Sequence, residues 1–272
     1  MRLRSALYLP ASNARAIEKA RALPSDAVIL DLEDAVAPDA KETARAQAVA
    51  ALREDWGSRF LVVRMNGLDT RWGRDDAAAL AHADCPAVLI PKVSTPADLE
   101  AVRTRLPCPA LWAMIETPSA ILNLSALAGV AGALSLTTLV TGTNDLAKEL
   151  RCRPDAARTP LLPALTQIVL AARAAGIFAL DGVLNALDDP DQLRAECEQG
   201  AMLGFDGKTL IHPGQIAAAN AAFGPSEAEL TWARRVVDAF AAPEAAGKGA
   251  IRLDGAMVER LHLAEAERLL AG

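Results

Sequence analysis

Two carboxylates, Glu116 and Asp145, occupy positions at which acidic side chains do chemistry. Each lies just past a run of apolar residues with strand character, 110–115 and 134–140. Carboxylates that are close together and poorly solvated repel each other unless they share a proton or a cation. Two carboxylates completed by water and substrate oxygens suit Mg²⁺, which rarely takes an all-protein cage. The pattern therefore predicts a magnesium site, with the alternative that both residues are helix N-terminal acids favoured by the helix dipole.

Other polar residues follow the remaining apolar runs. They are Asp31, Glu33, Asp34, Arg64, Asn66, Lys92, Asp181 and His212. Arg64 can bind a substrate carboxylate through two N–H groups, or it can form a structural salt bridge to the acidic residues 31–34. For Lys92 a surface or salt-bridge role is favoured over a Schiff base. For His212 a packing or capping role is favoured over that of a base.

Short apolar runs with β character alternate with stretches of helical period. Strands are expected at residues 6–9, 27–30, 60–65, 87–90, 110–115, 134–140, 177–180 and 209–211. Helices are expected at residues 14–22, 40–54, 75–83, 96–106, 118–128, 161–175, 190–202 and 213–223. Eight strands, each followed by a helix, favour an α/β fold, a closed (β/α)8 TIM barrel, over an open doubly wound sheet. The open sheet is disfavoured because the chain has no G-x-G-x-x-G motif at the start of the first expected helix.

The barrel explains why the polar residues matter, because active sites of such barrels lie at the C-terminal ends of the strands. We expect residues 1–224 to form the barrel and residues 225–272 to form a C-terminal helical extension. In that extension the pattern predicts a helix at 226–242, a glycine-containing stretch at 243–255 and a final helix near 257–270. The extension is too short for us to expect a core of its own, and a lid or an arm on a neighbouring subunit would suit it.

Composition excludes several classes of protein. The net charge of −6 argues against a nucleic-acid-binding protein and against a polybasic membrane anchor. The uncharged run between Glu116 and Asp145 contains Pro118, Gly129 and Gly132, so it predicts a buried helix and strand and no membrane span. Residues 1–10 have no apolar h-region, and we expect a cytoplasmic protein. Four scattered cysteines, Cys85, Cys108, Cys152 and Cys197, predict reduced thiols.

Ordered motifs along almost the whole chain resemble the citrate lyase β-subunit-like proteins of the HpcH/HpaI aldolase superfamily. They are Arg4-Ser5 leading to Pro10, residues 30–36 (LDLEDAV), 63–66 (VRMN), 90–93 (IPKV), 115–117 (IET), 142–146 (GTNDL), 204–208 (GFDGK) and 211–216 (IHPGQI). The resemblance implies a barrel, usually trimeric, that cleaves or forms a carbon–carbon bond with Mg²⁺. It also implies that Glu116 and Asp145 are the metal ligands and that Arg64 holds the carboxylate or oxo group of the substrate.

The C-terminal segment resembles the family's segment that reaches the active site of an adjacent subunit. Acyl-CoA lyases of the family carry an aspartate two residues after the methionine, as the proton-transfer group. This chain has Glu259 after Met257. The longer side chain keeps the carboxylate but moves it, and a misplacement of about 1 Å can cost about two orders of magnitude in rate.

The resemblance therefore implies a Mg²⁺-dependent carbon–carbon lyase that acts on a hydroxy-carboxyacyl-CoA thioester, such as citryl-, citramalyl- or malyl-CoA. The products would be an acyl-CoA and a small oxo acid. Two alternatives remain: an aldolase that acts on free hydroxy-oxo acids without CoA, and a non-catalytic subunit of a lyase complex. The basic residues near the N-terminus are compatible with CoA, but they equally fit a solvated helix face.

Overall fold

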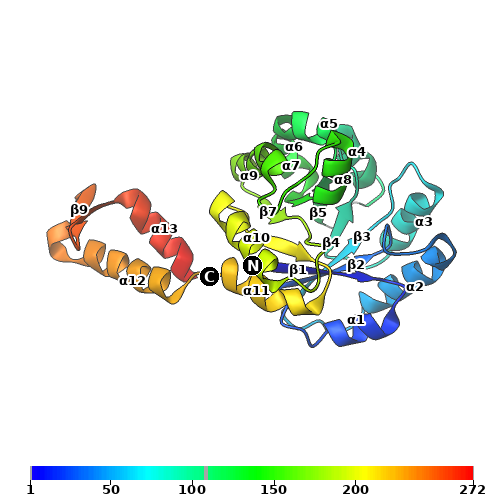
Figure 1. The fold of residues 1–272 in the computed structure, drawn as a ribbon, viewed down its shortest axis with the longest axis horizontal. Helices are drawn as coiled ribbons and strands as arrows, with labels where there is room; N and C mark the ends of the chain where they lie inside the picture. The colour runs from blue at the N-terminus through cyan, green and yellow to red at the C-terminus, as the bar shows by residue number, and fades with distance from the viewer. Residues whose placement is uncertain (1, 107–109, 272) are drawn as a thin grey trace. The chain divides into compact units, whose positions relative to one another are not determined.

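Eight parallel strands close into a barrel in the computed structural model, which describes residues 2–106 and 110–271 (Figure 1). In chain order they are β1 (Ser5–Pro10), β2 (Ala27–Asp31), β3 (Phe60–Arg64), β4 (Ala87–Ile90), β5 (Ala110–Ile115), β6 (Leu136–Thr141), β7 (Phe178–Asp181) and β8 (Gly207–Leu210). Each strand pairs with the next, and β8 pairs with β1. The predicted closed (β/α)8 barrel is confirmed.

The strands have two buried faces, which is why most of their residues are apolar. Buried polar residues such as Lys208 and Thr209 of β8 are exceptions. In β2, Ile29 belongs to the apolar cluster inside the barrel, while Val28 and Leu30 belong to the cluster between the barrel and its helices. Trp112 of β5 is fully buried inside and stacks on Phe60, with the ring centroids 6.0 Å apart. Because side chains fill the interior, only the ends of the strands can offer a site.

Helices surround the barrel and follow the expected order (Figure 1). They are α1 (Ala14–Ala20), α2 (Lys41–Ala51), α3 (Arg71–Leu80), α4 (Pro96–Arg103), α5 (Pro118–Leu122), α6 (Leu124–Gly129), α7 (Ala131–Leu134), α8 (Thr143–Leu150), α9 (Leu162–Ala175), α10 (Pro190–Leu203) and α11 (Ile216–Ala222). Short 3₁₀ turns precede α2, α9 and α11 at Pro38–Ala40, Thr159–Leu161 and Pro213–Gln215.

Three helical predictions need correction. The helix expected at 118–128 breaks at Asn123 into α5 and α6. Helix α3 begins four residues before the expected start, because the Thr70 hydroxyl accepts a hydrogen bond from the Gly73 amide and caps it there. Helix α8 had no counterpart in the sequence pattern, although its polar first turn carries Asp145.

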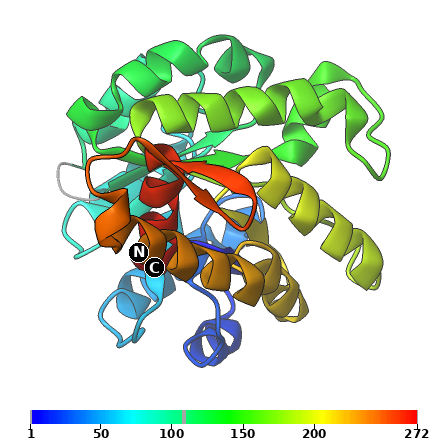
Figure 2. The same ribbon diagram turned by 90° about the vertical axis from the view of Figure 1, so that its left-hand side faces the viewer.

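The C-terminal unit begins at Gly224 and is separate from the barrel unit, Leu3–Phe223. Within it, α12 (Glu227–Ala241) and α13 (Arg260–Ala271) pack together beside the hairpin of β9 (Ala250–Leu253) and β10 (Ala256–Glu259) (Figure 2). The hairpin replaces part of the expected glycine-containing stretch and the start of the final helix. The unit has a small apolar cluster of its own, around Val236 and Val258, which its length did not lead us to expect.

Across the described parts of the chain, no helix is both long enough and apolar enough to cross a membrane. The run between Glu116 and Asp145 forms α5, α6, α7 and β6. The expected strand is largely buried, but the expected buried helix is replaced by three short helices with exposed outer faces, as at Leu122. Cys85, Cys152 and Cys197 are free thiols, and Cys108 lies outside the described residues.

Candidate active site at the barrel mouth

Arg64 is fixed at the mouth of the barrel by a two-point ion pair. Asp31 ends β2 and Arg64 ends β3, and the register of the two strands places them side by side. Arg64 Nε donates to Asp31 Oδ1 at 2.7 Å, and Nη2 donates to Oδ2 at 2.6 Å. The Tyr8 ring lies 4.9 Å from the Arg64 guanidinium carbon. Burial opposes the charge on Arg64, but the hydrogen bonds to Asp31 and the negative charges nearby outweigh it and raise the pKa of Arg64.

The loop after β2 turns its acids toward the same guanidinium. Glu33 Oε2 lies 2.9 Å from Arg64 Nη1, and the exposed carboxylate of Asp34 lies 3.8 Å away. In a continued strand, Glu33 and Asp34 would point to opposite faces. Because β2 ends at Asp31, this alternation does not apply to them. Burial, followed by neighbouring charges, raises the pKa of Glu33 although Arg64 opposes the shift. The salt bridge that was one of two interpretations of Arg64 is therefore present.

Lys41 holds this acidic loop in place from the first turn of α2. Its ammonium donates to the carbonyl oxygens of Leu32 at 2.7 Å and Glu33 at 2.6 Å, and to Asn66 Oδ1 at 2.8 Å. Burial lowers the pKa of Lys41, although the surrounding acids oppose the shift. The sequence analysis missed this residue. The sequence did hold a signal. A lysine in the first turn of a helix is disfavoured by the helix dipole, so its presence there indicates a specific partner.

Glu116 is the most deeply buried acid of the predicted pair, with 2% of the residue exposed. It follows β5, and its Oε1 accepts a hydrogen bond of 2.8 Å from the backbone N–H of Lys92. Its side chain packs against the α-carbon of Gly142, where any Cβ would overlap with the Glu116 Cβ and Oε2 atoms. Glycine at 142 therefore makes room for the carboxylate.

The surroundings of Glu116 disfavour its charged form. Burial is the largest cause, and the charges of Glu33 and Asp145 add to it, while the Lys92 hydrogen bond and Arg64 oppose it. Together they raise the pKa of Glu116 to about 7. Asp145 lies half-buried in the first turn of α8, which starts directly after Gly142. The two predicted metal ligands thus lie close enough for their charges to interact, at the ends of neighbouring strands.

These residues fit a divalent cation held by few protein ligands. Among the described residues, no group of three or more His, Cys, Asp and Glu side chains could hold a metal. A cation at Glu116 and Asp145 would thus have two carboxylate ligands, and water and substrate would complete its shell, as Mg²⁺ prefers. It would also offset the charge repulsion that raises the pKa of Glu116.

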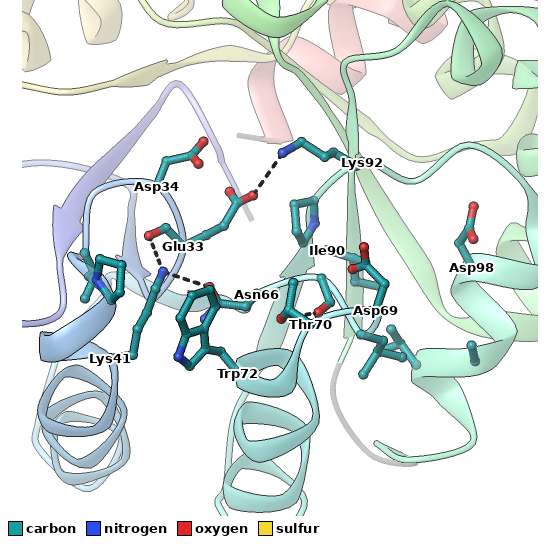
Figure 3. A pocket seen from close by; sticks show the side chains of 17 residues that line it. Glu33, Asp34, Lys41, Asn66, Asp69, Thr70, Trp72, Ile90, Lys92 and Asp98 are labelled. Carbon is teal, nitrogen blue, oxygen red and sulfur yellow. Dashed lines mark hydrogen bonds and ion pairs between the residues drawn. The ribbon is translucent and has the colours of Figure 1, made fainter.

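A cavity of about 640 Å³ adjoins the acidic loop (Figure 3). The loops after β2, β3 and β4 and helix α4 line it, and it shares Glu33, Asp34 and Lys92 with the mouth. Trp72, Leu68 and Val102 provide apolar wall, and Asp69 and Asp98 add negative charge. Glu116, Asp145 and Arg64 are not among its lining residues, so the cavity lies beside the carboxylate pair.

Two other rim residues have structural roles. Asp181 is one of the polar residues that follow the predicted strands. It points outward from β7 into a buried ion cluster. It pairs with Arg158 at 2.8 Å and with Lys208 at 3.3 Å, and Lys208 also binds Glu196 at 3.0 Å. His212 caps the turn Pro213–Gln215 through its Nδ1 atom, which confirms the capping interpretation.

Glu259 ends β10 in the C-terminal unit. Its backbone N–H donates to His262 Nδ1 at 2.9 Å, and the residue is half-buried. Its predicted role as the proton-transfer group stays a prediction.

Comparisons with known proteins identify the family of the chain. The family model for HpcH/HpaI aldolase/citrate lyase matches residues 4–213. A (3S)-malyl-CoA thioesterase of Cereibacter sphaeroides is 52% identical over 98% of this chain and 93% of its own length, and the citrate lyase subunit beta of Escherichia coli is 34% identical over 94% and 88%. The crystal structure of CitE from Mycobacterium tuberculosis with magnesium, acetoacetate and coenzyme A has a TM-score of 0.82 and 30% identity, and covers 98% of this chain and 96% of that one. The chain therefore belongs to the HpcH/HpaI aldolase/citrate lyase family.

Proposed function

We propose that this protein acts on a short hydroxy-carboxyacyl-CoA thioester of the malyl-CoA type, with Mg²⁺ held by Glu116 and Asp145. The observation that carries the proposal is the buried Glu116 carboxylate, whose charged form is disfavoured by burial and by the charges of Glu33 and Asp145 and would be stabilised by a cation. The malyl-CoA thioesterase among the relatives supports the substrate class, and the relative crystallised with magnesium and coenzyme A supports the cofactor.

Bound Mg²⁺ would act as a Lewis acid that polarises the acyl group's oxygen atoms. The chain's own residues orient the acyl group. Arg64, held by Asp31 and Tyr8, would bind an oxygen of that group beside the cation. Lys41 keeps the acidic loop, and with it Glu33, in position. Glu259 would transfer a proton from the C-terminal segment of an adjacent subunit, so the proposal includes a trimer, in the cytoplasm.

Hydrolysis of the thioester is the first candidate reaction, because the relative at 52% identity is a thioesterase. Water would attack the thioester carbon, the C–S bond would break, and CoA would leave as the thiol. Carbon–carbon cleavage, the reaction expected from the motifs, is the second candidate and is supported by the citrate lyase relative. There the hydroxyl would lose its proton and the C–C bond would break, giving the oxo acid and the enolate of acetyl-CoA. That enolate would then take up a proton to give acetyl-CoA.

Product analysis separates these reactions. The purified protein is incubated with malyl-CoA, with Mg²⁺ or with a chelator, and the products are identified by chromatography. We expect free CoA and malate, only with Mg²⁺. Acetyl-CoA and glyoxylate would instead support the lyase. No turnover of malyl-, citramalyl- or citryl-CoA would contradict the proposal and leave the CoA-independent aldolase and the non-catalytic subunit, which CoA titration and pull-down from native extract distinguish.

A further inference from the structure

Lys92 has an unusual position between the carboxylate pair and the cavity. It follows Pro91 at the end of β4 and has a left-handed backbone with φ of 52°, which is uncommon for a residue other than glycine. In this conformation its backbone N–H donates to Glu116. Its side chain points toward Glu33 (Figure 3). Lys92 thus fixes a predicted metal ligand with its backbone and still has its ammonium available.

The ammonium of Lys92 has donors to spare. The side chain is 57% exposed, and its ammonium forms an ion pair with Glu33 Oε1 at 3.7 Å. An ammonium has three N–H donors, and this separation is longer than a hydrogen bond. Lys41, the other cation that lines the cavity, directs its three donors to three acceptors within hydrogen-bond distance.

An acyl group with a free carboxylate needs such a cation, because the surroundings are acidic. Glu33 and Asp34 line both the mouth and the cavity, and Asp69 and Asp98 lie further along the cavity wall. Arg64 directs Nε and Nη2 to Asp31. A carboxylate that moved deeper into the cavity would approach Asp69 and Asp98, and Lys41, which also lines the cavity, already directs its donors to three acceptors. The favourable position of the carboxylate is therefore at the edge, against Lys92.

We propose that Lys92 forms a carboxylate subsite at this edge, where its ammonium binds the free carboxylate of the acyl group. The inference rests on the proposed function and makes the site selective for acyl groups that carry an acid. Arg64 then serves the hydroxyl or oxo oxygen. Because Asp69 and Asp98 repel an anion, the subsite also limits the acyl group to a short chain.

The test compares malyl-CoA with free CoA, which lacks the acyl carboxylate. In Lys92→Gln the backbone donor to Glu116 is retained and only the charge is lost. Loss of one charge-assisted hydrogen bond predicts that the KM for malyl-CoA rises about 10- to 100-fold. The kcat should change little, and the inhibition constant of free CoA should stay the same. Lys92→Arg should recover most of the affinity.

The matched control is Lys148→Gln, which removes one charge from an exposed site on α8 and should behave as the wild type. An unchanged KM in Lys92→Gln overturns the inference. So does an equal rise in the KM for malyl-CoA and the inhibition constant of CoA, because Lys92 would then act on the CoA part or on the fold. If the wild type turns over none of malyl-, citramalyl- and citryl-CoA, the proposed function is wrong. Equilibrium binding then decides the role of Lys92: the inference holds only if Lys92→Gln binds malyl-CoA more weakly and free CoA as tightly as the wild type.

Discussion

At Glu116 the fold keeps a carboxyl group where its charged form is disfavoured. Burial and the neighbouring acids raise the pKa of Glu116 to about 7, while the Lys92 amide and Arg64 only partly compensate. The folded protein therefore holds this proton to a higher pH than the unfolded chain does. The contribution of Glu116 to stability is complete below its ordinary pKa, and it is lost as the pH rises through about 7.

A bound cation should offset the stability that is lost when Glu116 ionises, because Mg²⁺ binds the ionised carboxylate. Below about pH 7, the Mg²⁺ affinity should fall about tenfold for each pH unit, since protons compete for Glu116. We expect Mg²⁺ to raise the Tm more about one unit above that pH than one unit below it. Thermal unfolding with and without Mg²⁺ at both pH values measures this. An equal rise in the Tm at the two pH values would argue against Glu116 as a Mg²⁺ ligand.

The residues that the sequence identified share one property: each lies just past an apolar strand. That rule found Arg64, Glu116 and Asp145, because a barrel brings the C-terminal strand ends to one mouth. It wrongly included Asp181, since the position along a strand does not tell which face a side chain takes when both faces are buried. It missed Tyr8 and Lys41, whose roles depend on contacts across the barrel mouth.

At the scale of elements, α8 and the residue before it position the carboxylate pair. Gly142 ends the turn from β6 and leaves space that the Glu116 side chain fills. Asp145 then lies in the first helical turn, where the dipole favours its charge. The pairing of β5 with β6 brings the two acids together.

Gly142→Ala should therefore displace Glu116. The backbone at Gly142 has φ of −100°, which alanine tolerates, so the expected effect comes from the overlap of the new Cβ with Glu116. A shift of the carboxylate of about 1 Å should weaken Mg²⁺ binding by about tenfold or more. Gly132→Ala in α7 is the control, since its Cβ would meet nothing within 4 Å. Titration calorimetry with Mg²⁺ compares them, and equal affinities would refute the role of Gly142.

Most strands were predictable because each is an apolar run bounded by turn residues. The exception is β8, where Lys208 and Thr209 interrupt the pattern and the strand covers Gly207–Leu210 instead of the expected 209–211. Helix α8 was not predictable, because its eight residues carry a polar first turn and no long apolar period. The hairpin of β9 and β10 did have a signal: its turn is Asp254-Gly255, with both residues at positive φ, and Asp-Gly is a typical hairpin turn. The two strands are too short and too exposed to show a clear alternation of apolar and polar residues in the sequence.

At the scale of the whole molecule, the net charge of −6 concealed an uneven distribution. Acidic groups gather around one barrel mouth, where Arg64, Lys92 and a divalent cation can offset them. The C-terminal unit carries Glu259 on a separate compact body, joined to the barrel through Gly224. The proposal assigns this body to the active site of an adjacent subunit.

Mixed oligomers test that assignment. Glu259→Gln alone should lose most of its turnover and keep the Mg²⁺ affinity. Glu267→Gln, an exposed change in α13, should keep both the turnover and the Mg²⁺ affinity of the wild type. Glu116→Gln alone should also be inactive. When chains with Glu116→Gln and Glu259→Gln are co-expressed, some sites combine an intact Glu116 with an intact Glu259 from a neighbour, and activity should return. No recovery in verified mixed oligomers would mean that Glu259 does not act across subunits.

The central claim is that Glu116 and Asp145 together bind a divalent cation, and titration calorimetry with Mg²⁺ tests it most directly. The account predicts one Mg²⁺ per wild-type chain. It also predicts at least about tenfold weaker binding in Glu116→Gln and in Asp145→Asn, with the circular dichroism of the folded barrel retained. Glu149→Gln, which removes an exposed carboxylate from the same helix as Asp145, should bind as the wild type does. An unchanged Mg²⁺ titration in either Glu116→Gln or Asp145→Asn would contradict the claim.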